Sequence, residues 1–414
     1  MTTLITHIQQ LVAVRDSYHL LRGNEMQSLP VLEDAFLLVE DGIIAQYGKM
    51  YELELKVPVL PAHIIDATGQ FVLPTWCDSH THLVFAQSRE GEFIDKIKGL
   101  SYADIAARGG GILNSAEKLA AATEEELFES GMVRLQEMMR LGTGAVEIKS
   151  GYGLSLEGEL KMLRVIKKIK AAAPIPVKAS FLGAHTYPAA YKESHAAYIS
   201  LLVDELLPVI AKEQLADYID VFCESGFFSP AEMETICLAA GQYGLLPKLH
   251  VNQLNSIGGL QKAIQLNALS VDHLETMTPV DIQDLAASNT IGTLLPTAAF
   301  FLRMNYQPAR QMIDAGAAIA LATDYNPGSS PSGNMNFVLS LSCIQLKMLP
   351  EEAINAATIN AAYAMELQDE LGSISIGKKA NLIFTKPMPS LAYLPYAFGA
   401  NLIDKVMING IILA

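Results

Sequence analysis

The chain has 414 residues, of which 50% are hydrophobic and 18% charged, and its formal net charge is −15. This length is enough for a large domain with a smaller companion, and the composition is typical of a globular protein. The acidic charge disfavours nucleic acid, no apolar run approaches the roughly 20 residues of a membrane span, and the N-terminus lacks a signal-peptide pattern. We therefore expect a cytoplasmic protein that binds neither nucleic acid nor a membrane.

Both ends of the chain are predicted to form short strands. In the first segment, residues 1–70, the stretch AFLLVEDGIIAQYGK has two apolar runs around Asp41 and Gly42, which is typical of a β-hairpin. The last segment, residues 361–414, has further short apolar runs broken by Gly or Asn-Gly. Neither end has enough strands for a core of its own. We therefore expect one small β-domain built from both ends.

The middle segment, residues 71–360, alternates between strand-like and helix-like stretches. Its helix-like stretches carry apolar residues at helical spacing and end in Gly or Pro. This repetition predicts a (β/α)₈ barrel, with an open doubly wound sheet as the alternative. The strand-like runs are FVLPTWCDSHTH, GTGAVEIKSGYG, PIPVKASFLGAH, YIDVFCESG, LPKLHVNQ, ALSVDHLE, IGTLLPTA and AIALATDYNPG.

The position of the polar residues decides between these two folds. They stand at the C-terminal ends of the runs, and in a barrel these ends share one mouth, which is where barrel active sites lie. In an open sheet they would be spread along an edge. We therefore predict the barrel, with a mouth formed by His80, His82, Glu147, Lys149, His185, Glu224, His250, His273 and Asp324.

Five histidines at these strand ends predict a metal centre. A lone His on a strand is most often a core residue, but His80 and His82 are two residues apart and so share one face of a strand. His250 ends the fifth run and Asp324 the eighth, which adjoins the first run in a closed barrel. Imidazole and carboxylate suit both zinc and iron, and a catalytic site keeps one position open for water. We expect one divalent or trivalent metal per chain, zinc or iron, bound by His80, His82, His250 and Asp324.

These strand ends resemble the metal site of the amidohydrolase superfamily. The resemblance is carried by DSHTHLVF, KLHVNQ, VDHLE and ATDYNPG, and by GSISIGKKANLIF, which has Asn381 where Asp is common. It implies a distorted (β/α)₈ TIM barrel with a β-sandwich formed by both chain ends. Within the superfamily the chain resembles the imidazolonepropionases most closely, through FAQSREGEF, SYADIAARGGGI, EIKSGYGL, FLGAHTYP, TDYNPGSSP and PYAFGANLI.

The resemblance implies a reaction. That family hydrolyses the cyclic amide of 4-imidazolone-5-propanoate to N-formimidoyl-L-glutamate in histidine degradation. A metal lowers the pKa of its water to about 7, so hydroxide is available at neutral pH. Asp324 would take the proton of this water and return it to the leaving nitrogen, and His273 would polarise the ring carbonyl.

The same resemblance suggests that the site holds a single metal. Relatives with two metals bridge them with a Lys at the end of strand four, where this chain has Cys223 and Glu224. Lys149 ends an earlier strand and is poorly placed to form such a bridge. We therefore expect a structural role for Lys149.

The substrate contacts also follow from the resemblance. Arg89 lies on a loop over the barrel mouth, and its guanidinium matches the propionate tail. Gln253 follows the strand-five His, where many relatives carry a carboxylate. An amide can orient a ring by hydrogen bonding but cannot take a proton at neutral pH, so we expect Gln253 to bind the imidazolone ring. The other expected contacts are Tyr102, Tyr152, His185, Asn326, Gly328 and Ser329.

Two other functions fit part of the pattern. A deaminase of the same superfamily would share the metal site and His273, but such enzymes place an acidic group where this chain has Gln253. A catalytically inactive binding protein would be expected to have lost metal ligands, and here the whole set is present.

By analogy with the superfamily we expect a homodimer. The four cysteines form no C-x-x-C pair and are expected to be reduced and mostly buried.

Overall fold

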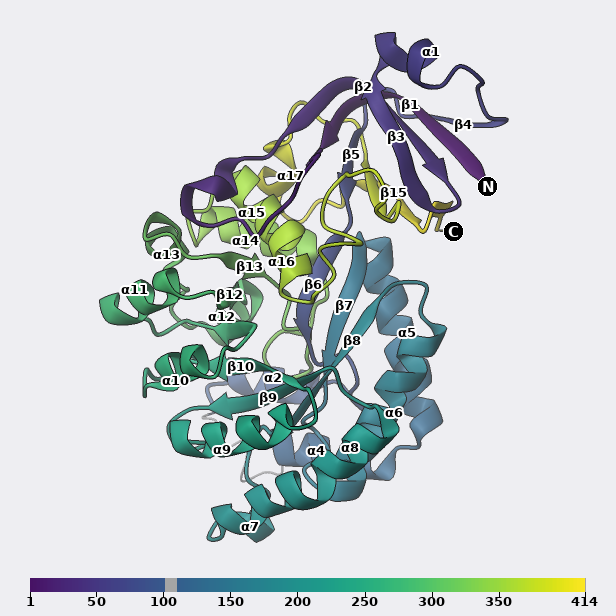
Figure 1. Cartoon of the computed structure of the whole chain (residues 1–414). Helices are drawn as coiled ribbons and strands as arrows, with labels where there is room; N and C mark the ends of the chain where they lie inside the picture. The colour runs from purple at the N-terminus through teal and green to yellow at the C-terminus, as the bar shows by residue number, and fades with distance from the viewer. Residues whose placement is uncertain (101–109, 414) are drawn as a thin grey trace.

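The computed structural model describes residues 1–100 and 110–413, and its larger part is a barrel of parallel strands (Figure 1). The strands lie side by side in chain order, and each of the eight predicted runs forms one of them. The predicted barrel is therefore confirmed. Its strands are β6 (Trp76–Thr81), β7 (Thr143–Lys149), β8 (Val177–Ala184), β9 (Tyr218–Cys223), β10 (Leu246–Val251), β11 (Ser270–His273), β12 (Ile291–Leu294) and β13 (Ile319–Leu321).

The barrel closes through the chain that follows β13 rather than through β13 itself. The amide of Asp324 donates to the carbonyl of His80 over 3.0 Å, and the amide of His82 donates to the carbonyl of Tyr325 over 2.9 Å. These two bonds place the end of the last strand beside the end of the first. The barrel is therefore closed at the C-terminal ends of its strands.

Helices cover the outside of the barrel (Figure 1). Several begin at a Ser or Thr whose hydroxyl accepts the N3 amide, as at Thr123, Ser155, Ser229 and Thr278. The helices between the strands are α2 (Glu90–Ile97), α4 (Ile112–Ala121), α5 (Glu124–Arg140), α6 (Leu156–Ala172), α7 (His195–Ser200), α8 (Leu207–Glu213), α9 (Pro230–Gly241), α10 (Gly259–Gln265), α11 (Pro279–Ala287), α12 (Pro296–Leu302) and α13 (Ala309–Asp314). After β13 come α14 (Met335–Ile344), α15 (Pro350–Ala357), α16 (Ile359–Tyr363) and α17 (Tyr393–Tyr396).

The two chain ends together build a mixed β-sheet, as predicted, and both termini lie at this sheet (Figure 1). Strand β1 pairs antiparallel with β2 and parallel with β4 and β5, while β5 pairs with β14 from the other end of the chain. The predicted hairpin is β2 and β3, turning at Asp41 and Gly42, which both have positive φ. The strands are β1 (Thr2–Val12), β2 (Val31–Glu40), β3 (Ile43–Lys49), β4 (His63–Asp66), β5 (Phe71–Pro74), β14 (Leu382–Thr385), β15 (Ile403–Ile408) and β16 (Ile411–Ile412), and α1 (Leu53–Lys56) follows β3.

The two domains meet between consecutive strands. β5 belongs to the mixed sheet and β6 to the barrel, with Thr75 alone between them. Part of the apolar core of the mixed sheet is a cluster of its own, while other residues of this sheet, such as Phe71 and Ile383, pack in the same cluster as the barrel core. The exact division at residues 70 and 360 stays a prediction. Among the helices in the described ranges, none combines the length and the apolar character needed to cross a membrane.

Candidate metal centre and active site

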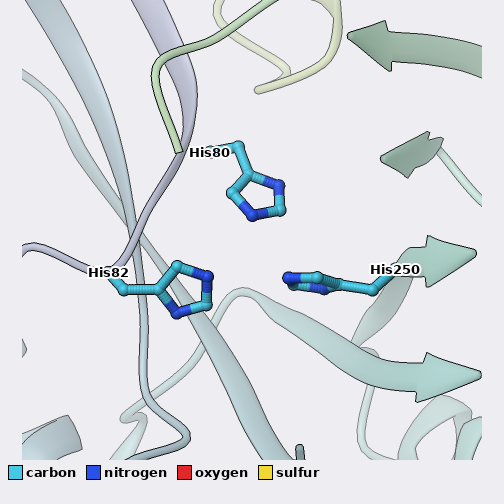
Figure 2. Close-up of side chains that lie close together, drawn as sticks. All are labelled: His80, His82 and His250. Atoms are coloured by element: carbon cyan, nitrogen blue, oxygen red, sulfur yellow. The ribbon is translucent and has the colours of Figure 1, made fainter. Parts of the chain in front are cut away.

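Three of the predicted ligands meet at the mouth of the barrel. His80 lies in β6, His82 is the first residue after this strand, and His250 lies in β10. All three side chains are buried. The ring centroid of His80 is 5.3 Å from that of His82 and 4.5 Å from that of His250. Figure 2 shows the three imidazoles pointing toward a common centre. One nitrogen of each lies within 4.8 Å of the others, so one ion could bind all three.

Asp324 reaches the same centre from the opposite end of the sheet. It follows β13 with φ of +53°, a left-handed conformation that is uncommon for a residue other than glycine. Its Oδ1 lies 3.5 Å from Nε2 of His80 and 3.5 Å from Nε2 of His82. The structure therefore brings together all four residues that the sequence predicts as ligands.

The three imidazoles are in the chemical state that a metal requires. Burial lowers the pKa of His80, His82 and His250 well below the ordinary value, so the imidazoles are neutral. Nε2 of His80 is buried and has no hydrogen-bond partner within the described part of the chain. A buried nitrogen without a partner is costly unless something binds it. The set therefore fits a single metal ion.

Two buried aspartates orient the histidines from behind. Oδ2 of Asp272 lies 2.7 Å from Nδ1 of His80, and Oδ2 of Asp220 lies 2.9 Å from Nδ1 of His250. Holding Nδ1 in this way directs Nε2 toward the metal position. Neither aspartate is among the residues predicted from the sequence. The available signal was a carboxylate in the middle of a buried apolar strand, in YIDVFC and SVDH.

Lys149 links these two aspartates. Its Nζ lies 2.9 Å from Asp220, 3.5 Å from Asp272 and 2.7 Å from Glu147, and all four side chains are completely buried. Burial alone would lower the pKa of Lys149, but the three carboxylates raise it, so the ammonium stays charged. Lys149 thus contacts the groups that hold the ligands and lies outside the ligand set itself.

His273 lies beside the metal position. It ends β11 with φ of +88°, and its ring centroid is 5.6 Å from that of His80 and 5.1 Å from that of His250. Its Nδ1 is 3.4 Å from Oε1 of Glu275, a carboxylate that also accepts from Gln307 over 3.0 Å. Burial would lower the pKa of His273, but Glu275 raises it. Glu275, which contacts Nδ1 of this imidazole, is not among the residues predicted from the sequence.

A cavity of about 510 Å³ opens above the centre, a size suited to a small molecule. Nearly all the predicted contacts line it together, whereas Tyr102 lies outside the described residues. The predicted lining residues are His82, Arg89, Tyr152, His185, His250, Gln253, His273, Asp324, Asn326, Gly328 and Ser329. The unpredicted ones are Lys96, Ile112, Phe222, Phe227, Leu254 and Leu302.

Loops hold the polar groups of this cavity in place. The amide side chain of Asn326 shapes the last loop, since its Oδ1 accepts the backbone amides of Gly328 and Ser329 over 2.8 Å each. His185 stacks on His82 with ring centroids 5.6 Å apart and lies 3.0 Å from the carbonyl of Gly151. The carboxylate of Glu224 accepts the amides of three consecutive residues, Gln253, Leu254 and Asn255.

A parallel barrel with this centre at the carboxyl ends of its strands defines a metal-dependent hydrolase. Residues 71–413 match the amidohydrolase family, which covers the barrel and the C-terminal part of the mixed sheet. Over its full length the chain is similar to proteins named imidazolonepropionase. It is 58% identical to that of Flavobacterium johnsoniae over 99% of both chains, and 39% identical to that of Alkaliphilus metalliredigens over 98% of this chain and 96% of the other. The chain belongs to the amidohydrolase family and, within it, to the imidazolonepropionases.

Solved structures with lower identity share the fold. Guanine deaminase from E. coli superposes with a TM-score of 0.73 at 13% identity, covering 100% of this chain and 99% of the other. A zinc-bound adenosine deaminase from Xanthomonas campestris superposes with a TM-score of 0.70 at 18% identity, covering 99% and 92%. At these identities the comparison concerns the architecture alone.

Proposed function

We propose that the protein hydrolyses the ring amide of 4-imidazolone-5-propanoate to N-formimidoyl-L-glutamate, with one zinc or iron ion held by His80, His82, His250 and Asp324. The observation that carries this proposal is the shared cavity: the buried centre, His273 and the guanidinium of Arg89 all border it. These are the groups that a cyclic amide with a carboxylate tail needs. The name of the relatives supports the same substrate.

The bound metal would supply a water that loses its proton near neutral pH. The chain's own residues handle the protons and the developing charge. Asp324 accepts the proton of the attacking water and passes it to the ring nitrogen when the C–N bond breaks. Glu275 raises the pKa of His273 and so favours its imidazolium form, in which Nδ1–H donates to Glu275 and Nε2–H donates a hydrogen bond to the carbonyl oxygen.

The remaining contacts hold the substrate in place. Arg89 binds the propionate tail, and Gln253 hydrogen-bonds the imidazolone ring. Tyr152 and His185 form an aromatic wall beside His82. Tyr102, Asn326, Gly328 and Ser329 complete the predicted set.

The first test is the loss of imidazolone absorbance when purified protein meets freshly made 4-imidazolone-5-propanoate. We expect decay that yields N-formimidoyl-L-glutamate, stops after chelation and returns with added metal. Elemental analysis of the same sample should find one zinc or iron per chain. If a protein with one metal per chain leaves the absorbance unchanged, the substrate assignment is wrong, and assays of ammonia release from purines and pyrimidines would then test deamination.

We further propose that the chain works as a homodimer in the cytoplasm. The dimer rests on analogy with the superfamily. Light scattering on the purified protein should give twice the mass of 44.8 kDa, and a monomer mass would contradict the proposal.

A further inference from the structure

Helix α2 carries a row of charged residues, and the first and last of them line the cavity. Arg89 stands at its N-cap, Glu92 three residues later and Lys96 four residues after that, so the spacing puts all three on one helix face. Arg89 and Lys96 both line the cavity. Glu92 lies between them in the sequence, and its side chain is only 12% exposed. The proposed reaction gives no role to Glu92 or Lys96.

Arg89 is only partly satisfied in this arrangement. Its Nη2 lies 2.5 Å from Oε2 of Glu92. Its Nε is buried and has no hydrogen-bond partner among the residues that the structure describes. On the other side of the guanidinium, a Cβ at Gly328 would lie 2.3 Å from Nη1, so only glycine leaves it room. The guanidinium therefore has a free N–H for a further acceptor.

Lys96 has still fewer partners. Its Nζ donates one long hydrogen bond, of 3.4 Å, to the carbonyl of Gly328 and lies 5.9 Å from the centroid of the Phe301 ring. It forms no ion pair with any residue in the described ranges. An ammonium carries three donors, so most of its capacity is unused at the edge of the cavity.

The row consists of two cations and one carboxylate, so its net charge is one positive charge. Arg89 and Glu92 by themselves form a neutral pair, which would offer an anionic tail no net attraction. We propose that Lys96 is a second cation that binds the carboxylate tail of the substrate. The carboxylate of Glu92 limits the net positive charge of the row, so that the cavity admits ring compounds with a single anionic tail. The proposal rests on the proposed function for the ring substrate, and Lys96 is a specificity-determining residue in that reaction.

Two ligands that differ only in tail charge test this inference: imidazole-4-propionate and its primary amide, titrated by calorimetry into the metal-loaded protein. In Lys96→Met we expect the carboxylate to bind about tenfold more weakly, because one charge-assisted contact is lost. Binding of the amide should be unchanged. Lys98→Met is the matched control, since it removes the same charge from an exposed position at the end of the same helix. It should leave both affinities unchanged.

Glu92→Gln should shift the carboxylate affinity in the opposite direction. It keeps the hydrogen-bonding shape but removes the competing charge, so the carboxylate should bind more tightly and the amide as before. Equal weakening of both ligands by Lys96→Met would overturn the proposal, because it would show that Lys96 only shapes the cavity. Weaker carboxylate binding in Glu92→Gln would overturn the role of Glu92.

Turnover is read separately from binding. With 4-imidazolone-5-propanoate, Lys96→Met should raise KM about tenfold with kcat nearly unchanged. If the wild-type protein fails to convert this compound, the proposed function is wrong, whereas the difference between carboxylate and amide binding still decides the role of Lys96.

Discussion

At the scale of single residues, the proposed reaction divides between groups that move protons and groups that bind. Asp324 lies against two of the histidines, within 3.5 Å of each. Gln253 stands on a loop whose backbone is held by Glu224 over 2.6 Å, so its side chain is positioned without being ionisable. This arrangement makes the two residues unequal in catalysis.

We expect Asp324→Asn to lower kcat by about 10³-fold or more, because it removes both a ligand and the proton acceptor. Gln253→Ala should mainly raise KM, by about tenfold, because it removes a hydrogen bond to the ring. Steady-state kinetics on both variants, with the metal content of each sample measured, checks this difference. If Gln253→Ala were as inactive as Asp324→Asn, Gln253 would have to take part in the proton transfers.

The four candidate ligands could be found from sequence because each stands at the end of a strand-like run. Two histidines two residues apart share a strand face, and a closed barrel joins its last strand to its first. Asp220 and Asp272 were missed because each contacts a histidine on a different strand, His250 and His80 respectively. No spacing rule connects these two pairs in the sequence.

At the scale of elements, one buried network of charges joins strands β7, β9, β10 and β11. Lys149 on β7 contacts Asp220 on β9 and Asp272 on β11, and these hold His250 and His80. A second lysine on β10, Lys248, contacts Glu147 over 3.0 Å, Ser270 over 3.0 Å and the carbonyl of Ala364 over 2.8 Å. The two lysines therefore share Glu147, but within the described part of the chain Lys149 is the lysine that forms ion pairs with Asp220 and Asp272.

We expect Lys149→Met to weaken metal binding by about 10- to 100-fold, the usual effect of losing the support behind metal ligands. Lys248→Met is the matched control, because it also removes a buried ammonium from the same cluster. Its loss should lower the stability of the fold, by about 3–5 kcal/mol, while leaving the metal affinity nearly unchanged. Equilibrium competition with a chromogenic chelator measures the affinity, and denaturant unfolding measures the stability. An equal loss of metal affinity in both variants would show that the network acts through its total charge.

All eight barrel strands could be predicted because buried parallel strands appear in sequence as compact apolar runs between helical segments. The strand order of the mixed sheet could not. β1 lies next to β5 and β2 within it, and β5 pairs with β14, more than 300 residues away in the sequence. Such pairing depends on the tertiary fold of the whole chain. The apolar pattern of a strand does not indicate which other strand will pair with it.

At the scale of the whole molecule, the C-terminal segment fastens the mixed sheet to the barrel. The carbonyl of Asn381 accepts the amide of Thr75, which joins β5 to β6, over 3.0 Å, and its Oδ1 accepts the amide of Asn409 over 2.8 Å. Just before it, Lys378 is buried at the junction of the two domains. Its Nζ donates to the carbonyl of Leu371 over 2.9 Å and to the hydroxyl of Ser373 over 2.7 Å, and lies 3.5 Å from the centroid of the Tyr18 ring.

The buried ammonium of Lys378 should make the stability of the fold depend on pH. Burial lowers its pKa from 10.5 to about 8, with Cys77 and Asp369 opposing the change. Between these two values the unfolded chain binds this proton and the folded chain does not, so the free energy of unfolding rises with pH across that window and levels off below it. The shift corresponds to about 3 kcal/mol.

We therefore expect the wild-type protein to gain about 3 kcal/mol of stability relative to Lys378→Met between pH 8 and pH 10.5. Denaturant unfolding of both proteins at several pH values measures the difference, and titrations common to both cancel. Lys379→Met is the control, because the neighbouring lysine is 34% exposed and pairs with Glu370. The free energy of unfolding of Lys379→Met should change with pH in the same way as that of the wild type. A constant difference between the wild type and Lys378→Met across this window would mean that the folded protein keeps Lys378 protonated, and that the junction tolerates a buried charge.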